Sequence, residues 1–239
     1  MFRELDPKRI VETADTLERR IAERFPGAGL ARVAAELAQV TREADAVSAW
    51  LAKPIHALRA AVALLVLALL TVVTIALSLI RVDFHGEGFS ELAQGVAASV
   101  DNCVFVGIAI YFLLGIERRI KRARASKALH VLRSLAHIVD MHQLTKDPER
   151  LVGANQATAS SPKRDMSPFQ LTRYLDYCSE MLALISKVAA LYVQRFDDEA
   201  ALSAAGDVED LTVGLSRNIW QKIMILDRMT EPGAAEPIG

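Results

Sequence analysis

Apolar residues in this chain gather in two long blocks, whereas elsewhere they recur every three or four positions. The first block runs from Ala60 to Ile80 as 21 consecutive residues without a charge, mostly Leu, Val, Ala and Ile. A helix of that length reaches about 30 Å, which is the thickness of the hydrocarbon core of a bilayer. The first block therefore predicts a transmembrane helix.

The second block, from Val96 to Ile116, is less uniformly apolar. Ser99, Asp101 and Asn102 lie near its start, and an uninterrupted apolar run follows from Cys103. That run alone reaches about 21 Å, so a crossing needs the preceding turn as well. The pattern predicts a second transmembrane helix with Asp101 close to the outer headgroup boundary.

Lysine and arginine near the ends of the two blocks predict their direction. A basic run follows the second block, whereas the connection from residue 81 to 95 has one arginine against three acidic residues. Positive residues mark the cytoplasmic side, so we expect both termini inside, as in a protein of the bacterial inner membrane. The same run suggests lipid-headgroup contacts, although the topology rule alone explains it. The residues are Arg118, Arg119, Lys121, Arg122 and Arg124.

Amphipathic helices are predicted on both sides of the apolar blocks. Asp6 and Ser167 each precede a proline and read as N-caps at the start of a three-four apolar repeat. The stretch from Pro26 to Gly29 predicts a turn between two N-terminal helices. A second break is expected at Ala204-Ala205-Gly206, with Asp207 capping the last helix.

The predicted fold is all-α: a two-span transmembrane helical hairpin with cytoplasmic helical-hairpin or coiled-coil-like bundle segments. Eight segments are expected along the chain. They are an N-terminal cytoplasmic helical pair (1–56), transmembrane helix 1 (57–81), a short extracytoplasmic loop (82–95), transmembrane helix 2 (96–117), a cytoplasmic extension of that helix (118–147), a flexible linker (148–167), a C-terminal cytoplasmic helical pair (168–230) and a disordered tail (231–239).

Small residues recur every fourth position along the second block. Such a ridge lets a neighbouring helix backbone approach closely, which drives helix association in lipid. The neighbour is either the first span or a second copy of the chain. The predicted ridge is formed by Gly95, Ser99, Cys103 and Gly107.

Two further groups are candidates for chemistry. Asp101 and Asn102 are polar groups inside a span block, so they can line a pore in an oligomer, or simply contact water at the interface. His137 and Asp140 lie three residues apart on a helix and can share a metal, or flank the apolar face of a packed helix. A complete set of metal ligands is not visible at this spacing.

Composition and the absence of known motifs limit the classes of function that we expect. A formal net charge of -1 argues against an extended nucleic-acid-binding face. The chain has no phosphate-binding loop, nucleophile elbow or zinc-protease motif, so we expect no catalytic residue, no cofactor and no enzyme. The leading hypothesis is a membrane-anchored helical scaffold or adaptor that binds the lipid bilayer and either itself or a cytoplasmic helical protein. The alternative is a small homo-oligomeric ion channel or pore-forming effector whose second span lines the conduit.

Overall fold

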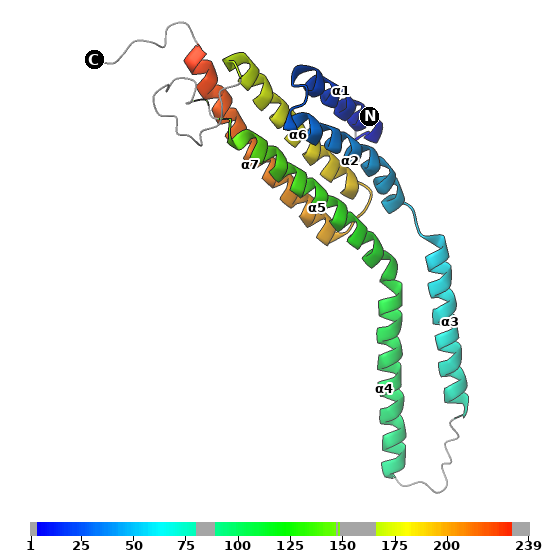
Figure 1. The fold of residues 1–239 in the computed structure, drawn as a ribbon. Helices are drawn as coiled ribbons and strands as arrows, with labels where there is room; N and C mark the ends of the chain where they lie inside the picture. Colours follow the sequence, from blue (N-terminus) through cyan, green and yellow to red (C-terminus); the bar gives the residue numbers. More distant parts are fainter. Residues whose placement is uncertain (1–3, 80–88, 147, 149–165, 231–239) are drawn as a thin grey trace. The chain divides into compact units, whose positions relative to one another are not determined.

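A computed structural model describes residues 4–79, 89–146, 148 and 166–230 (Figure 1). Every regular element among these residues is an α-helix, which confirms the all-α class. The contacts divide the chain into two units, which are considered separately. The larger unit comprises residues 1–52 and 124–239, and the smaller unit comprises residues 53–123. The helices are α1 (Pro7–Arg24), α2 (Gly29–Ala52), α3 (His56–Leu79), α4 (Phe89–Leu114), α5 (Ile116–Leu144), α6 (Pro168–Val193) and α7 (Glu199–Thr230).

Both predicted N-caps are confirmed. The Asp6 carboxylate accepts a hydrogen bond from the backbone N–H of Lys8 at 3.0 Å, where α1 begins. At the start of α6 the Ser167 hydroxyl accepts from the Gln170 N–H at 3.2 Å, and the Gln170 side chain accepts from the Ser167 N–H at 2.9 Å. This reciprocal pair satisfies two backbone donors that a helix start leaves without a partner.

The turn between α1 and α2 is fixed by a glycine and an aromatic side chain. Gly27 has a φ of 75°, a left-handed conformation that residues with a Cβ rarely adopt. Just before it, the Phe25 ring packs edge-on against Tyr174 and Tyr177 of α6, with ring centroids 5.4 and 6.2 Å apart. The turn therefore holds the α1–α2 hairpin against α6.

The expected break at Ala204-Ala205-Gly206 is wrong, because α7 runs without interruption from Glu199. The connection between α6 and α7 lies earlier, and the buried Asp198 caps α7 by accepting a hydrogen bond from the Ala201 N–H at 3.2 Å. Gly206 is tolerated inside the helix, where it lowers stability without ending the element. Asp207 therefore lies within α7 and is not its cap.

The core of the larger unit is centred on α6. Leu175, Met181 and Ile185 are completely buried along it. A buried stripe of α5 belongs to the same core. In addition, α7 is hydrogen-bonded to α5, because the Lys222 ammonium donates to the backbone and side-chain oxygens of Gln143 at 2.9 and 2.7 Å. The stripe of α5 consists of Ala125, Leu129, Leu132, Leu135, Ala136 and Val139.

Both cysteines are free thiols. Cys103 is exposed on α4, whereas Cys178 is buried in the core on α6. Burial raises the pKa of the Cys178 thiol to about 12, so this thiol stays protonated at neutral pH. Cys178 is a small apolar core residue and not a reactive nucleophile.

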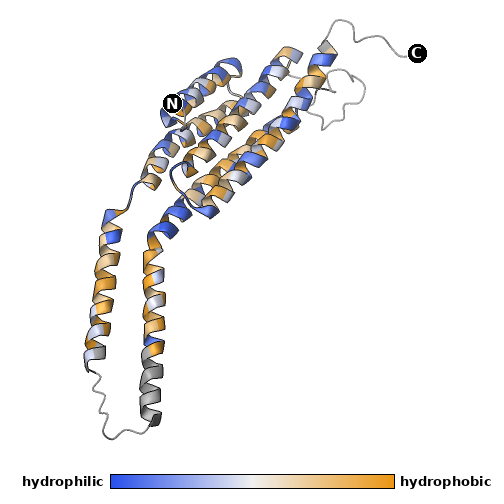
Figure 2. Cartoon of the chain, turned by 180° about the vertical axis from the view of Figure 1, so that it is seen from behind, coloured by the Kyte–Doolittle hydropathy of each residue, from blue (hydrophilic) through white to orange (hydrophobic). Residues whose placement is uncertain are grey.

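The smaller unit contains α3, α4 and the first residues of α5, and its two long helices are mostly apolar (Figure 2). By length and composition the segment that includes α3 is one candidate span, and α4 with α5 is a second if this broken pair counts as one span. A break at Gly115 separates α4 from α5.

The boundaries of α4 differ from the predicted ones at both ends. The helix begins at Phe89, inside the predicted loop 82–95, because residues 89–94 include the helix formers Glu, Leu, Ala and Gln. It ends at Leu114, so Glu117 belongs to α5. Three further predictions fall outside the described residues: the remainder of the predicted loop, most of the predicted linker and the predicted tail.

A close contact between α2 and α5 gives a test of the packing. A Cβ added to Gly29, the first residue of α2, would lie 2.5 Å from Cε1 of the half-buried His142 ring. Gly29→Ala should therefore destabilise the protein by about 1–3 kcal/mol, although Ala is intrinsically the better helix former. In the double variant with His142→Ala, most of that cost should vanish. Thermal unfolding of the purified full chain in detergent, followed by circular dichroism, measures both effects.

Gly214 of α7 supplies the matched control. A Cβ there would meet nothing within 4 Å, so Gly214→Ala should stabilise by about 0.5–1 kcal/mol. Equal stabilisation by Gly29→Ala would contradict the contact between α2 and His142.

Candidate functional site around Glu117

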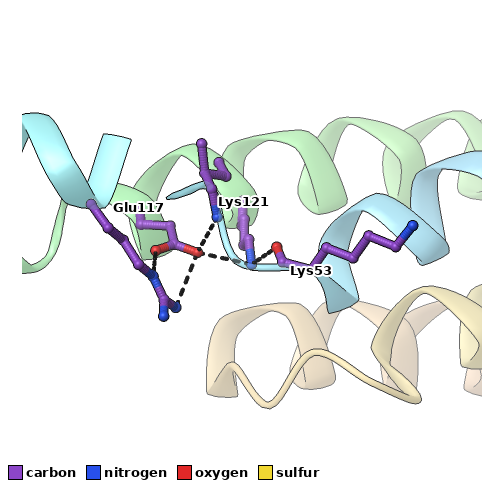
Figure 3. Close-up of polar contacts among 5 residues, drawn as sticks. Lys53, Glu117 and Lys121 are labelled. Carbon is purple, nitrogen blue, oxygen red and sulfur yellow. Dashed lines mark hydrogen bonds and ion pairs between the residues drawn. The ribbon is translucent and has the colours of Figure 1, made fainter. Parts of the chain in front are cut away.

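Five residues form a polar cluster where the chain enters α3 and leaves α4 (Figure 3). We name this set the Glu117 cluster; all of it belongs to the smaller unit. It comprises Lys53, Ile55, Arg59, Glu117 and Lys121.

The Glu117 carboxylate is the centre of the cluster. Its Oε2 atom accepts a hydrogen bond from Nε of Arg59 at 2.6 Å. Its Oε1 atom accepts from the backbone N–H of Ile55 at 3.2 Å and lies 3.1 Å from Nζ of Lys121. A single carboxylate in the first turn of α5 thus binds the residue before α3, the first turn of α3 and Lys121 in the second turn of α5.

Lys121 is the buried cation of the cluster, since only 7% of its surface is exposed. Its ammonium donates to the backbone carbonyl of Lys53 at 2.8 Å, in addition to its contact with Glu117. Burying a charge is costly unless it is paired and hydrogen-bonded. Both conditions hold here, so removal of either partner should cost more than loss of an exposed ion pair.

The surroundings stabilise the charged form of Glu117. Hydrogen bonding to Arg59 is the largest cause that lowers the pKa of the Glu117 carboxyl, to about 2, and Lys121 and the Ile55 N–H act in the same direction against partial burial. Glu117 is therefore ionised at neutral pH. It lies beyond the apolar run, among basic residues, so the charged form also has favourable long-range neighbours.

The cluster also completes two helix ends. The first backbone N–H groups of a helix have no partner within it, and the Ile55 N–H directly precedes α3. Glu117 accepts this hydrogen bond from a distant part of the sequence, as a capping side chain would. The same carboxylate lies in the first turn of α5, where a negative charge interacts favourably with the positive end of the helix dipole.

An apolar groove extends from the cluster between α3 and α4, with a volume of about 610 Å³. Arg59 and Glu117 line its polar end, and aliphatic side chains line the rest. The aliphatic residues are Leu58, Val62, Ala63, Val66, Leu67, Leu70, Leu113, Leu114 and Ile116.

The predicted lipid-headgroup residues do not share one surface. Arg118 is exposed, whereas Lys121 lies inside the Glu117 cluster. The Arg119 guanidinium stacks over Phe112 at 4.5 Å, and that of Arg124 stacks over Trp50 at 4.6 Å in the larger unit. Arg122 is exposed and makes contacts of its own. Two of the five basic residues, Arg119 and Arg124, therefore make cation–π contacts with aromatic rings.

The predicted small-residue ridge is open where it is described. A Cβ on Gly107 would meet nothing within 4 Å, and Cys103 is exposed. The side chains of Gly95 and Ser99 lie outside the described residues. At Gly107, then, the ridge is not covered by α3, which leaves a second copy as the predicted neighbour.

The remaining predicted site residues lie apart from the cluster. Asp101 and Asn102 are exposed on α4, and their role in a conduit stays a prediction. His137 is exposed on α5, whereas the half-buried Asp140 accepts a hydrogen bond from the Gln143 side chain at 2.6 Å. Within the described ranges, no group of three or more His, Cys, Asp or Glu side chains is placed to hold a metal ion.

No protein-family model, no curated protein and no solved structure matches this chain.

Sequence reasoning overlooked the role of Glu117 and treated its neighbourhood as a basic run. One signal was present: Glu117 is the only acidic residue among the ten residues that follow the apolar block. An isolated carboxylate among cations indicates ion pairing, but the sequence does not reveal that its partners include Arg59 and the backbone N–H of Ile55, just before α3.

The ion pairs of Glu117 predict a pH dependence within the smaller unit. Because the pKa of Glu117 is lowered, its contribution to stability is complete above about pH 4.5 and is lost as the pH falls towards about 2. Spin labels at positions 57 and 123 should give one narrow distance distribution at pH 5, by double electron–electron resonance, that broadens through this range. In Glu117→Gln the distribution should be broad already at neutral pH.

Arg118→Gln is the control, since Arg118 is exposed next to Glu117 and outside the cluster. It should leave the distance distribution unchanged. A narrow distribution in Glu117→Gln at every pH would show that the carboxylate does not hold α3 to α5.

Proposed function

We propose that this protein is a membrane-anchored helical scaffold. In this proposal α3 and α4 cross the bilayer as a hairpin, both termini lie in the cytoplasm, and the helices of the larger unit bind other proteins or further copies of the chain. The scaffold is not an enzyme. The observation that carries the proposal is the large apolar surface that α3 and α4 leave uncovered.

Large apolar side chains are exposed along both of these helices. In water, burying one such side chain is worth about 1.5–3 kcal/mol, so leaving all of them exposed would cost an amount comparable with the whole stability of a typical domain, about 5–15 kcal/mol. Lipid hydrocarbon removes that cost. The exposed set is Leu64, Leu65, Leu67, Leu70, Val72 and Ile75 on α3, and Val100, Val104, Phe105, Ile108, Tyr111, Phe112 and Leu114 on α4.

The polar groups of α3 also suit a lipid environment. The hydroxyls of Thr71 and Thr74 donate to the backbone carbonyls of Leu67 and Leu70, each at 2.8 Å. Both hydroxyls are thereby satisfied within the helix, as a crossing requires. At the polar end, the Glu117 cluster supplies charged groups that belong in the interfacial region, and the adjoining basic residues favour a cytoplasmic position for that end.

The scaffold role itself is supported by the larger unit. Its described helices form one extended core, and exposed apolar side chains remain on the outer faces of α5 and α7. Such faces are typical of protein-interaction surfaces. They include Met141 and Leu144 on α5 and Val213, Trp220 and Met224 on α7.

The topology can be tested with reporters in bacterial cells. A green fluorescent protein fused after Gly239, which fluoresces only when folded in the cytoplasm, should be bright, and alkaline phosphatase inserted in the 81–88 connection should be active in the periplasm. The expected distribution follows from the basic residues beside the Glu117 cluster. The full chain should also stay in the membrane pellet after an alkaline carbonate wash.

Replacing Leu64, Leu67 and Val72 together by Asp should release the chain from the membrane pellet, because charges at the centre of a crossing are costly. The matched control is the same replacement at the exposed Leu202, Val213 and Met224 of α7, which should leave the chain in the pellet. A wild-type chain in the soluble fraction, or an active phosphatase at the C-terminus, would refute the proposed anchor.

A further inference from the structure

Two cavities lie along α1 and α6 in the larger unit. One is mostly apolar, with a volume of about 520 Å³, and the other is mostly basic, with a volume of about 460 Å³. Many of their lining residues follow one stripe on each helix, at spacings of three and four. The two cavities adjoin, because Glu180 of the first pairs with Arg20 of the second, and we name them together the α1–α6 groove. The stripes are Thr13, Leu17, Arg20 and Arg24 on α1, and Arg173, Tyr177, Glu180, Leu184 and Lys187 on α6.

The basic part of the groove is lined by three arginines, Arg20, Arg24 and Arg173, together with Glu23 and Tyr177. The guanidiniums of Arg24 and Arg173 each lie 5.8 Å from the centroid of the exposed Phe169 ring. Arg20 lies over Tyr177 at 5.3 Å and pairs with Glu180 at 3.0 Å, where the basic and apolar parts meet. Arg20 and Glu180 are each more than 40% exposed, so a docked partner can exchange with either of them.

An exposed stripe on α7 has the complementary chemistry. Asp210, Val213, Arg217, Trp220 and Met224 follow the same three-four spacing and are all exposed. The three apolar members of this set expose 49–59% of their surface. We name this set the outer stripe of α7. It lies on a different side of the helix from the buried residues Val208, Thr212, Ile219, Ile223 and Leu226.

The charged residues of the two surfaces also have the same spacing along their helices. On α6, Arg173 is followed seven residues later by Glu180 and three residues after that by Ala183. On α7, Asp210 is followed at the same intervals by Arg217 and Trp220. If the two helices lie parallel, opposite charges face each other twice. The small Ala183, which also lines the groove, then faces the large Trp220.

We propose that the chain self-associates by docking α7 of one copy, through its outer stripe, into the α1–α6 groove of a second copy, parallel to α6. Within one chain α7 is already fixed to the core by its buried face, so its outer stripe remains exposed and can contact a second copy. The contact joins two different surfaces. A two-fold pair contains it twice, and repeated use without closure gives a chain of copies. The proposal deepens the scaffold function and rests on it for the shared membrane orientation of the two copies.

Charge reversal tests the register directly. Arg217→Glu places an acidic side chain opposite Glu180, and Glu180→Arg places a basic side chain opposite Arg217. Because the facing charges then repel each other, each variant of the full chain should weaken association by about tenfold or more. Combining the two reversals in one chain should restore it. Mass photometry of the detergent-solubilised protein over a concentration series measures the dissociation constant.

Mixing the two single variants separates loss of the contact from loss of the fold. A chain carrying Arg217→Glu and a chain carrying Glu180→Arg should pair with each other as the wild type does, because both contacts of a two-fold pair are then complementary, while neither pairs with itself. Misfolded variants would not recover in this way. Arg133→Glu, an exposed reversal on α5 outside both surfaces, should leave the dissociation constant unchanged.

A wild-type chain that stays monomeric over the concentration series would overturn the proposal. So would association that both reversals leave intact, or variants that do not recover when combined or mixed. Cross-linking of the outer stripe of α7 only to a different protein would likewise overturn self-association. In each of these cases, a chain that remains in the membrane pellet leaves the proposed anchor standing.

Discussion

The uncovered apolar surface of α3 and α4 is the constraint on which the rest of this protein depends. Protein atoms within one chain leave many large side chains of these helices exposed. In our proposal lipid covers them, because apolar side chains favour an apolar medium over water. The shared compartment of the two termini and the exposure of the larger unit to the cytoplasm belong to the same proposal and depend also on the basic residues beside the second apolar block.

The Glu117 cluster shows how the two apolar helices are joined at their polar end. In hydrocarbon the hydrophobic effect does not press helices together, so their association needs packing and polar contacts. Between α3 and α4 the groove is lined by branched aliphatic residues, and the small residues Cys103 and Gly107 are open. The contacts of Glu117 with Ile55, Arg59 and Lys121 therefore supply a specific connection that aliphatic packing does not.

Local signals in the sequence predicted much of the fold. The caps at Asp6 and Ser167 involve residues within three positions of each other, so they can be read directly from the chain. The break assigned to Gly206 failed because one glycine only weakens a helix, whereas the true connection follows Phe196, where Asp198 supplies the cap. The predicted second span began at Val96, where the apolar block begins, but α4 begins at Phe89, because a helix can extend into the polar residues that precede an apolar block.

The sites were harder to predict than the fold. Two partners of Glu117, Ile55 and Arg59, lie 62 and 58 residues away, and the Arg20–Glu180 pair of the α1–α6 groove joins residues 160 positions apart. The sequence indicates which face of each helix is polar, but the register between two helices depends on tertiary packing. The match between Arg173–Glu180 and Asp210–Arg217 is visible in the sequence only after the structure places both stripes on the surface.

The depth of α3 in a bilayer tests the central claim most directly. A variant with Trp50→Phe, Trp220→Phe and Val72→Trp carries a single tryptophan near the middle of the first apolar block. In vesicles of phosphatidylcholine brominated near the ends of its acyl chains, the fluorescence of this tryptophan should be strongly quenched. The native Trp220, kept as the only tryptophan in a matched variant, should be unaffected. Equal and weak quenching of both would show that α3 does not lie in lipid hydrocarbon and would contradict the account.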